Sequence, residues 1–270
     1  MSERAPSCAR GPSTRLAATD RGDGRVVLLV HGQPGQGLDW NEVAGGLAST
    51  NRVVVPDRPG YGRTGGSAVG IAANADSLAH LLDDKGIDSA TVAGHSFGGG
   101  VAIAMAMRHR DRVGGLVLVG SIGTGTSLGP YDRVLGLPVV GEGLAFTGWE
   151  LSRRLLPLLR RRSTRLPQTL RALVRAVPQA SDPEAAWRSF VTEQRALLAE
   201  TPYLEAGLSS IRVPTAVVAG DRDRVVPARA ASELAATIPA AELIWVPGAG
   251  HLLPQEEPGV LVDVIRRYSS

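Results

Sequence analysis

A serine, an acid and a histidine lie in three separate segments of this chain, each close to glycine. The first segment, Gly94-His95-Ser96-Phe97-Gly98, follows the apolar run from Ala90 to Ala93 and fits the pattern G-x-S-x-G, in which a strand turns sharply into a helix. A serine at such a turn has a strained backbone, so its neighbours must lack side chains for the strand and the helix to approach. Ser96 would then project its hydroxyl from the edge of a sheet, as a nucleophile must.

An acid and a base that could activate this hydroxyl follow two later apolar runs. Asp221 and Asp223 both come after the run from Pro214 to Val218, where the acid that orients a histidine is expected. We favour Asp223 for that role and expect Asp221 to cap the turn. His251 lies in the glycine-rich loop after the last apolar run, and a base can reach a serine hydroxyl from such a loop.

Two backbone amides are candidates for stabilising a developing negative charge. The run from Val26 to Val30 ends in His31-Gly32-Gln33-Pro34-Gly35, and a glycine turn at the carboxyl end of a central strand can aim a backbone N–H into a ligand crevice. Together with the amide of Phe97, the amide of Gln33 would form an oxyanion hole. A plain strand-to-helix turn is the alternative interpretation. His31 and His95 flank glycine turns and are expected to brace loops.

Short β-branched runs alternate with helical patterns along most of the chain, and this alternation must position these residues. It predicts an α/β fold with a mostly parallel central sheet flanked by helices. Arg15 to Thr19 is interpreted as an earlier edge strand. The other predicted strands are Val26 to Val30, Val53 to Val55, Ala90 to Ala93, Leu116 to Val119, Ala216 to Ala219 and Leu243 to Val246. The predicted helices are Ile71 to Lys85, Phe97 to His109, Ala228 to Thr237 and Glu257 to Arg267.

The alternation stops between about Ile122 and Leu208, where helix-like stretches lie among Gly/Pro-rich joints. We interpret this region as a helical cap inserted after the sixth strand. The predicted organisation is a flexible segment at residues 1–13, a core formed by residues 14–125 and 208–270, and a cap at residues 126–207.

Within the cap, Arg153 to Arg175 carries eight arginines and no acid. A solvated amphipathic surface is the simplest interpretation, and attraction of an anionic substrate or an acidic membrane is the alternative.

The order Ser96, Asp223, His251 resembles that of the α/β-hydrolase superfamily, in which the three side chains follow one another as Ser, Asp and His. The resemblance covers roughly residues 14 to 125 and 208 to 268 and does not extend into the cap. Thr64 stands where the family usually has serine. The matching segments are His31-Gly32-Gln33-Pro34, Asp57 to Thr64, Gly94 to Gly98, Gly220 to Pro227 and Gly250-His251.

The resemblance implies two-step acyl transfer on a carboxylic ester or a lactone. His251, oriented by Asp223, would take the proton of Ser96, and the amides of Gln33 and Phe97 would stabilise the oxyanion. Perhydrolysis, as in the cofactor-free haloperoxidases, and carbon–carbon bond hydrolysis are alternatives on the same triad. Serine at the elbow argues against the dehalogenases and soluble epoxide hydrolases of this fold, which use aspartate there. A non-catalytic member that binds a small ligand is the alternative from another class.

Composition and motifs also bear on whether the protein contains a disulfide, a metal or a cofactor. The single cysteine, Cys8, excludes an intrachain disulfide and a cysteine-based zinc site. We predict no metal and no cofactor, because helical metal pairs and a phosphate-binding loop are absent, and the glycine pattern from Gly60 to Gly65 lacks the helix and downstream acid of a dinucleotide site.

Length and charge bear on location and partners. No apolar run reaches the roughly 18 residues that span a bilayer, and the first residues lack the apolar core of a secretory signal. The net charge is only +3, which does not indicate a nucleic-acid partner. We therefore expect a cytoplasmic protein with a small, apolar acyl or lactone substrate. The sequence does not predict an oligomeric state.

Overall fold

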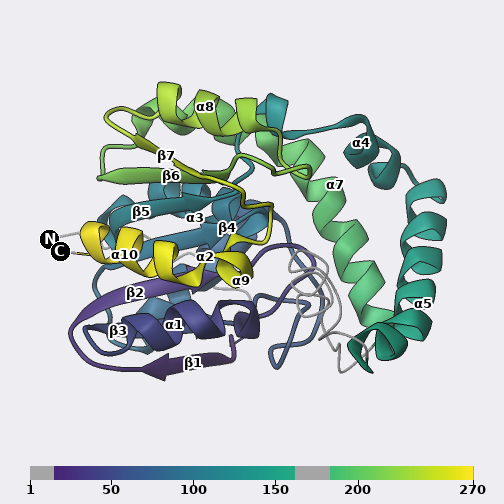
Figure 1. Cartoon of the computed structure of the whole chain (residues 1–270), viewed down its shortest axis with the longest axis horizontal. Helices are drawn as coiled ribbons and strands as arrows, with labels where there is room; N and C mark the ends of the chain where they lie inside the picture. Colours follow the sequence, from purple (N-terminus) through teal and green to yellow (C-terminus); the bar gives the residue numbers. More distant parts are fainter. Residues whose placement is uncertain (1–14, 162–182, 270) are drawn as a thin grey trace, which may run out of the picture.

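A seven-stranded sheet forms the centre of the molecule (Figure 1). The computed structural model describes residues 15–161 and 183–269, so the predicted N-terminal segment and Cys8 lie outside the described residues. The strand order is β1-β3-β2-β4-β5-β6-β7, in which β1 pairs antiparallel with β3 and all other pairs are parallel. The strands are β1 Ala18–Arg21, β2 Arg25–Val30, β3 Asn51–Pro56, β4 Ala90–His95, β5 Val113–Val119, β6 Thr215–Gly220 and β7 Glu242–Val246. The predicted α/β fold with a mostly parallel sheet is confirmed.

Successive residues of each strand point to opposite faces, and both faces are covered by helices. On β2, Leu28 and Val30 belong to the core beneath α2, α3 and α8, whereas Val27 and Leu29 belong to the core beneath α1 and α10. Two buried layers explain why the strands read as continuous apolar runs. The helices of the two layers are α1 Asn41–Leu47, α2 Ile71–Asp84, α3 Phe97–Arg108, α8 Ala228–Thr237, α9 Leu253–Glu256 and α10 Pro258–Tyr268. Short 3-10 helices cover Gly37–Trp40, Arg110–Arg112, Gly125–Ser127 and Leu208–Ser210.

The predicted edge strand exists, but its position differs from the expectation. It runs over Ala18–Arg21 rather than from Arg15 to Thr19. Its register explains the difference, because Ala18 pairs with Pro56 and Arg21 pairs with Val53 of the neighbouring strand. The length of β3 therefore sets where the edge strand begins.

A helical insertion separates β5 from β6 and stands over the carboxyl ends of the parallel strands (Figure 1). It contains α4 Pro130–Gly136, α5 Val140–Arg161 and α7 Pro183–Gly207. The prediction that it follows a sixth strand was wrong for the described chain. It follows the fifth strand, because only one strand, β1, precedes the strand that ends at Val30. We call these three helices the cap.

Part of the arginine-rich stretch lies in the described cap. Arg153 and Arg154 are exposed on α5, and both form ion pairs with Glu150 one turn earlier. The stretch beyond residue 161 lies outside the described residues. None of the helices in the described part of the chain has the length and the apolar character needed to cross a membrane.

Val139, at the joint between α4 and α5, has a φ of 62° and a side chain that is 79% exposed. A side chain in this left-handed region costs about 1–2 kcal/mol, whereas glycine adopts it freely but gains entropy in the unfolded chain. We therefore expect Val139→Gly to raise the free energy of unfolding by up to about 1 kcal/mol, measured by urea denaturation. The matched change Val140→Gly, at the first residue of α5, relieves no left-handed strain and should lower it by up to about 1 kcal/mol. Equal losses in both variants would contradict the argument.

Candidate active site

Ser96 lies at the sharp turn between β4 and α3, with a φ of 54° and a ψ of −120°. The neighbouring glycines permit this turn because there is no room for side chains around it. A Cβ at Gly94 would collide with the carbonyl of Gly98, and a Cβ at Gly98 would collide with the carbonyls of Val30 and His31. The turn places the hydroxyl at the N-terminus of α3, where backbone N–H groups have no partner within the helix.

The structure brings Ser96, His251 and Asp223 together from the ends of three strands. The Oγ of Ser96 is 3.0 Å from Nε2 of His251, and Nδ1 of His251 is 2.8 Å from Oδ2 of Asp223. In the tautomer that suits both contacts, Nδ1–H donates to the carboxylate and Nε2 accepts from the serine hydroxyl. An imidazole held in this way can take a proton from serine.

Asp223 is enclosed and well supplied with hydrogen-bond donors. Its side chain is 2% exposed, and its Oδ1 accepts hydrogen bonds from the backbone amides of Val225 and Val226 at 2.8 and 2.9 Å. Burial by itself raises the pKa of Asp223, but the hydrogen bonds from His251 and from the two amides outweigh it and leave the pKa lowered. Asp221 has another role, since its Oδ1 accepts a hydrogen bond from the amide of Gly248 at 2.7 Å.

His95, the residue before the serine, braces the loop that carries His251. Its Nε2–H donates to the backbone carbonyl of His251 at 2.8 Å, and the two rings lie 4.8 Å apart. Burial, together with the charge that His251 can carry, lowers the pKa of His95 from 6.5 to about 3. A neutral ring is therefore part of the folded state.

This buried neutral ring makes stability depend on pH. Because the pKa falls from 6.5 in the unfolded chain to about 3 in the folded protein, unfolding takes up a proton in that interval, and the stability from His95 is lost as the pH falls through it. We expect His95→Gln, which keeps an N–H donor, to reduce the slope of unfolding free energy against pH between about pH 5 and 6.5 by up to about 1.4 kcal/mol per pH unit. Urea unfolding measures it. A variant slope equal to that of the parent would contradict the prediction.

The glycine turn after β2 lies directly against the serine. A Cβ on Gly32 would lie only 3.1 Å from the Cβ of Ser96, so any larger residue would crowd the serine. Among the described residues, the backbone amides of Gln33 and Phe97 donate to no carbonyl and no side chain. Two backbone amides next to the turn at Ser96, with no acceptor in the described part of the chain, could donate to an oxyanion.

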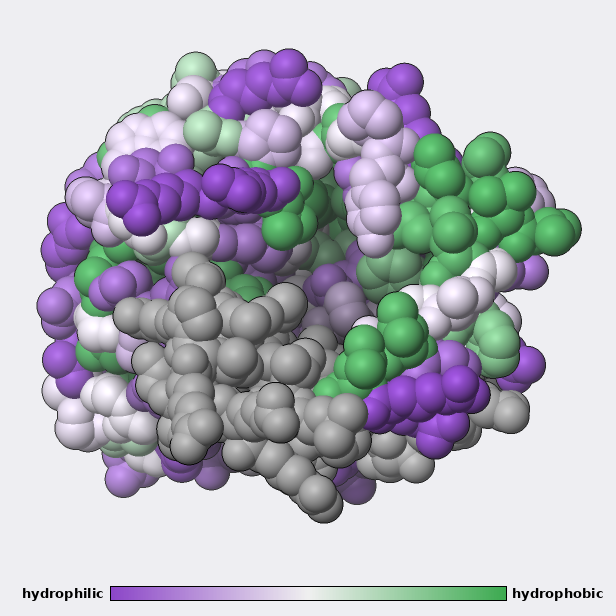
Figure 2. Space-filling model, turned by 45° about the vertical axis from the view of Figure 1, so that its right-hand side comes forward, coloured by the Kyte–Doolittle hydropathy of each residue, from purple (hydrophilic) through white to green (hydrophobic). Residues whose placement is uncertain are grey.

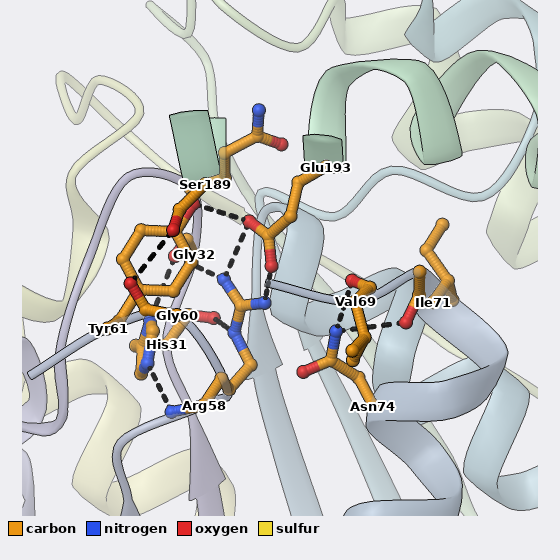
Figure 3. Close-up of polar contacts among 12 residues, drawn as sticks. His31, Gly32, Arg58, Gly60, Tyr61, Val69, Ile71, Asn74, Ser189 and Glu193 are labelled. Carbon is orange, nitrogen blue, oxygen red and sulfur yellow. Dashed lines mark hydrogen bonds and ion pairs between the residues drawn. The ribbon is translucent and has the colours of Figure 1, made fainter. Parts of the chain in front are cut away.

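One functional candidate was missed by sequence reasoning: a buried ion pair between the core and the cap. Arg58 and Glu193 are both 0% exposed and form a two-pronged contact, and the hydroxyl of Tyr61 donates to Oε2 of Glu193 at 2.8 Å (Figure 3). Burial and the nearby carboxylate raise the pKa of Tyr61 well above its usual range, which keeps the hydroxyl a donor. Arg58 stands in a motif segment, but no local pattern connects it with an acid 135 positions later.

Apolar side chains gather on the cap, where a hollow opens between the cap and the body of the molecule (Figure 2). They belong to α4, α5 and the joint between them. Those at least 42% exposed are Tyr131, Val134, Leu137, Val139, Val140, Leu144, Phe146, Leu151 and Leu155. Phe146 also meets Trp187 of α7 edge to face, with ring centroids 5.8 Å apart. No cluster of three or more His, Cys, Asp or Glu side chains suited to a metal ion occurs within residues 15–161 and 183–269.

Comparison with known proteins places this geometry in a family. The sequence model described as alpha/beta hydrolase fold matches residues 25–258. The chain belongs to the alpha/beta hydrolase fold family. It is 31% identical over 244 residues to a 2-hydroxymuconate semialdehyde hydrolase of Pseudomonas putida, covering 86% of this chain and 82% of that protein.

Solved structures of this family resemble the chain over nearly its whole length. A thermophilic esterase from Thermogutta terrifontis is 29% identical, with a TM-score of 0.73 over 94% of this chain and 92% of that one. An enzyme described as degrading N-acyl homoserine lactones is 27% identical, with a TM-score of 0.70 over 94% of this chain and 96% of that one. Members of the alpha/beta hydrolase fold family are hydrolases, and the family implies a small-molecule substrate.

Proposed function

We propose that this alpha/beta hydrolase cleaves a carboxylic ester or a lactone through an acyl-enzyme formed on Ser96. The observation that supports it most directly is the continuous chain of hydrogen bonds from Ser96 through His251 to Asp223, at 3.0 and 2.8 Å. The relatives described as an esterase and as a lactone-degrading enzyme act on these two substrate classes.

The chemistry follows from the roles of the three side chains. His251 takes the serine proton as Oγ attacks the carbonyl carbon, and the ionised Asp223 stabilises the imidazolium that forms. The amides of Gln33 and Phe97 stabilise the tetrahedral oxyanion, an effect worth about 3 kcal/mol per donor in other enzymes. His251 then protonates the leaving oxygen, and a water molecule activated by the same ring releases the acid.

The substrate is proposed to carry an apolar acyl group or lactone ring. The support is the set of exposed apolar side chains on the cap, among them Leu144, Phe146 and Leu155. Figure 2 shows that hydrophobic side chains lie near the hollow between the cap and the body of the molecule. Burial of an apolar acyl chain against such side chains yields about 0.8 kcal/mol for each methylene group. Esters of medium acyl length should therefore react with a lower KM than acetates.

A fluorophosphonate probe tests the proposal, since it reacts only with an activated serine. The parent protein should be labelled and Ser96→Ala should not. A panel of p-nitrophenyl esters and of lactones then separates the two substrate classes. Absence of labelling, under conditions that label a known serine esterase, would overturn the proposal in favour of a non-catalytic ligand-binding protein.

Carbon–carbon bond hydrolysis on the same three side chains is the second candidate. Its support is the 31% identity to a 2-hydroxymuconate semialdehyde hydrolase. A protein that is labelled by the probe, but turns over 2-hydroxymuconate semialdehyde faster than any ester, would favour this candidate. Activity that requires peroxide and halide would favour perhydrolysis instead.

A further inference from the structure

The guanidinium of Arg58 holds the glycine turn that lies against Ser96. It is fully buried, and Nε donates to the carbonyl of His31 at 3.0 Å while Nη2 donates to the carbonyl of Gly32 at 2.8 Å (Figure 3). The same group lies over the ring of Tyr61 and that of Phe97, at 5.1 and 4.8 Å from the ring centroids. Two hydrogen bonds to backbone carbonyls and two aromatic contacts therefore fix its position.

The contact with Gly32 determines the direction of the neighbouring amide. The carbonyl of Gly32 and the N–H of Gln33 belong to one planar peptide unit, and in a trans unit the two groups point in opposite directions. Both Nη2 of Arg58 and Nδ1 of His31 donate to that carbonyl, at 2.8 and 2.9 Å. The N–H of Gln33 must then point away from Arg58. A cation on the carbonyl also polarises the unit and makes the N–H a stronger donor.

The cap helix α7 contacts both Arg58 and the side chain of Gln33. Glu193 neutralises the guanidinium from α7, and the side-chain amide of Gln33 donates to the carbonyl of Phe190 at 3.0 Å and to the side chain of Gln194 at 3.2 Å. Ser189 donates to the carbonyl of Gly60 at 3.0 Å. Four residues within one short stretch of α7 thus contact the turns that surround Ser96.

We propose that Arg58 is a positioning residue, held by Glu193, that aims the amide of Gln33 at the oxyanion. The inference rests on the proposed function, because it requires a tetrahedral oxyanion at Ser96. Its consequence is that the cap does more than cover the substrate. The segment from Ser189 to Gln194 takes part in the geometry of the oxyanion hole, so changes in α7 should alter kcat even where they touch no substrate.

The test compares two variants. Arg58→Lys keeps the positive charge but loses the planar guanidinium that donates to several acceptors at once. Glu193→Gln keeps the size of the side chain but loses the negative charge opposite Arg58. Loss of an entire oxyanion donor costs about 10²- to 10³-fold in kcat, so a misdirected amide should cost about 10- to 100-fold with KM within about threefold. Affinity for a boronic acid, which forms a tetrahedral adduct with serine, should fall in parallel. Affinity for the free carboxylic acid product should not.

Two controls separate positioning from folding. Rates are expressed per serine that reacts with the fluorophosphonate probe, so a misfolded fraction does not count. Arg52→Lys removes the guanidinium of a two-pronged surface pair with Asp20 between β3 and β1 and should leave kcat unchanged. If Arg58→Lys does not fold, Glu193→Gln and Tyr61→Phe carry the test.

The outcomes distinguish the two proposals. A parent protein that hydrolyses esters, together with Arg58 and Glu193 variants of unchanged kcat and unchanged boronic acid affinity, would overturn the positioning role and leave the proposed function standing. A parent protein that neither reacts with the probe nor hydrolyses any ester would overturn both. A loss of kcat with equal loss of product affinity would assign Arg58 to substrate binding instead, and so contradict the inference.

Discussion

Ser96→Ala and His251→Ala should each lower kcat for an activated ester by about 10⁴- to 10⁶-fold, and the double variant should lose no more than either single one. In the proposed mechanism the two side chains act as one unit, joined by a 3.0 Å hydrogen bond. Without the hydroxyl there is no nucleophile, and without the imidazole the hydroxyl keeps its proton. The residual activity measures what the amides of Gln33 and Phe97 and substrate binding achieve alone.

The measurement is a progress curve with a p-nitrophenyl ester, with Ser127→Ala as the matched control. Ser127 is also buried, but its hydroxyl donates to the carbonyl of Thr124, and its removal should leave kcat within about threefold. Additive losses in the double variant would mean that the two residues act independently. Substantial activity in Ser96→Ala would mean that the nucleophile is another group.

Asp223→Asn should lower kcat by about 10⁴-fold with little change in KM. Oδ1 of Asp223 faces two N–H groups, from Val225 and Val226, so the carbonyl oxygen of asparagine must occupy that position. Its NH₂ group then faces Nδ1 of His251, which has to accept rather than donate. The ring is forced into the tautomer with the proton on Nε2 and can no longer take the proton of Ser96.

Asp221→Asn provides the matched control two positions away. Asp221 is exposed and bonds the amide of Gly248 rather than His251, so kcat should remain within about threefold. Circular dichroism and urea unfolding show whether both variants are folded. A larger loss in Asp221→Asn than in Asp223→Asn would reverse the assignment of the orienting acid.

The positioning role of Arg58 would extend the same logic to the cap. Here α7 also contacts the core through Glu200, whose carboxylate accepts from the backbone amides of Ile71 and Ala72 at the start of α2, at 3.1 and 2.8 Å. Replacement of the cap helix would therefore disturb α2 and the turn beside Ser96 together.

Much of the sheet could be predicted from local pattern because each strand is buried on both faces. Apolar runs such as Val26 to Val30 and Leu116 to Val119 lie within β2 and β5. Boundaries were less accurate where a partner strand decides them, as at β1, and the cap follows the fifth described strand rather than a sixth. The G-x-S-x-G pattern could be recognised in the sequence because the crowding around Ser96 permits only glycine at positions 94 and 98.

The sequence by itself determined the order of the serine, acid and histidine along the chain. It also indicated the main helices and strands and the glycine-flanked turn at Ser96, because these leave local patterns of apolar residues and glycine. Only the tertiary structure decided which of two aspartates meets His251, and that Arg58 meets Glu193 and Gln33 meets α7. These contacts join residues between 28 and 161 positions apart. Their partners are selected by packing of the cap on the core, and no periodicity or local motif records that selection.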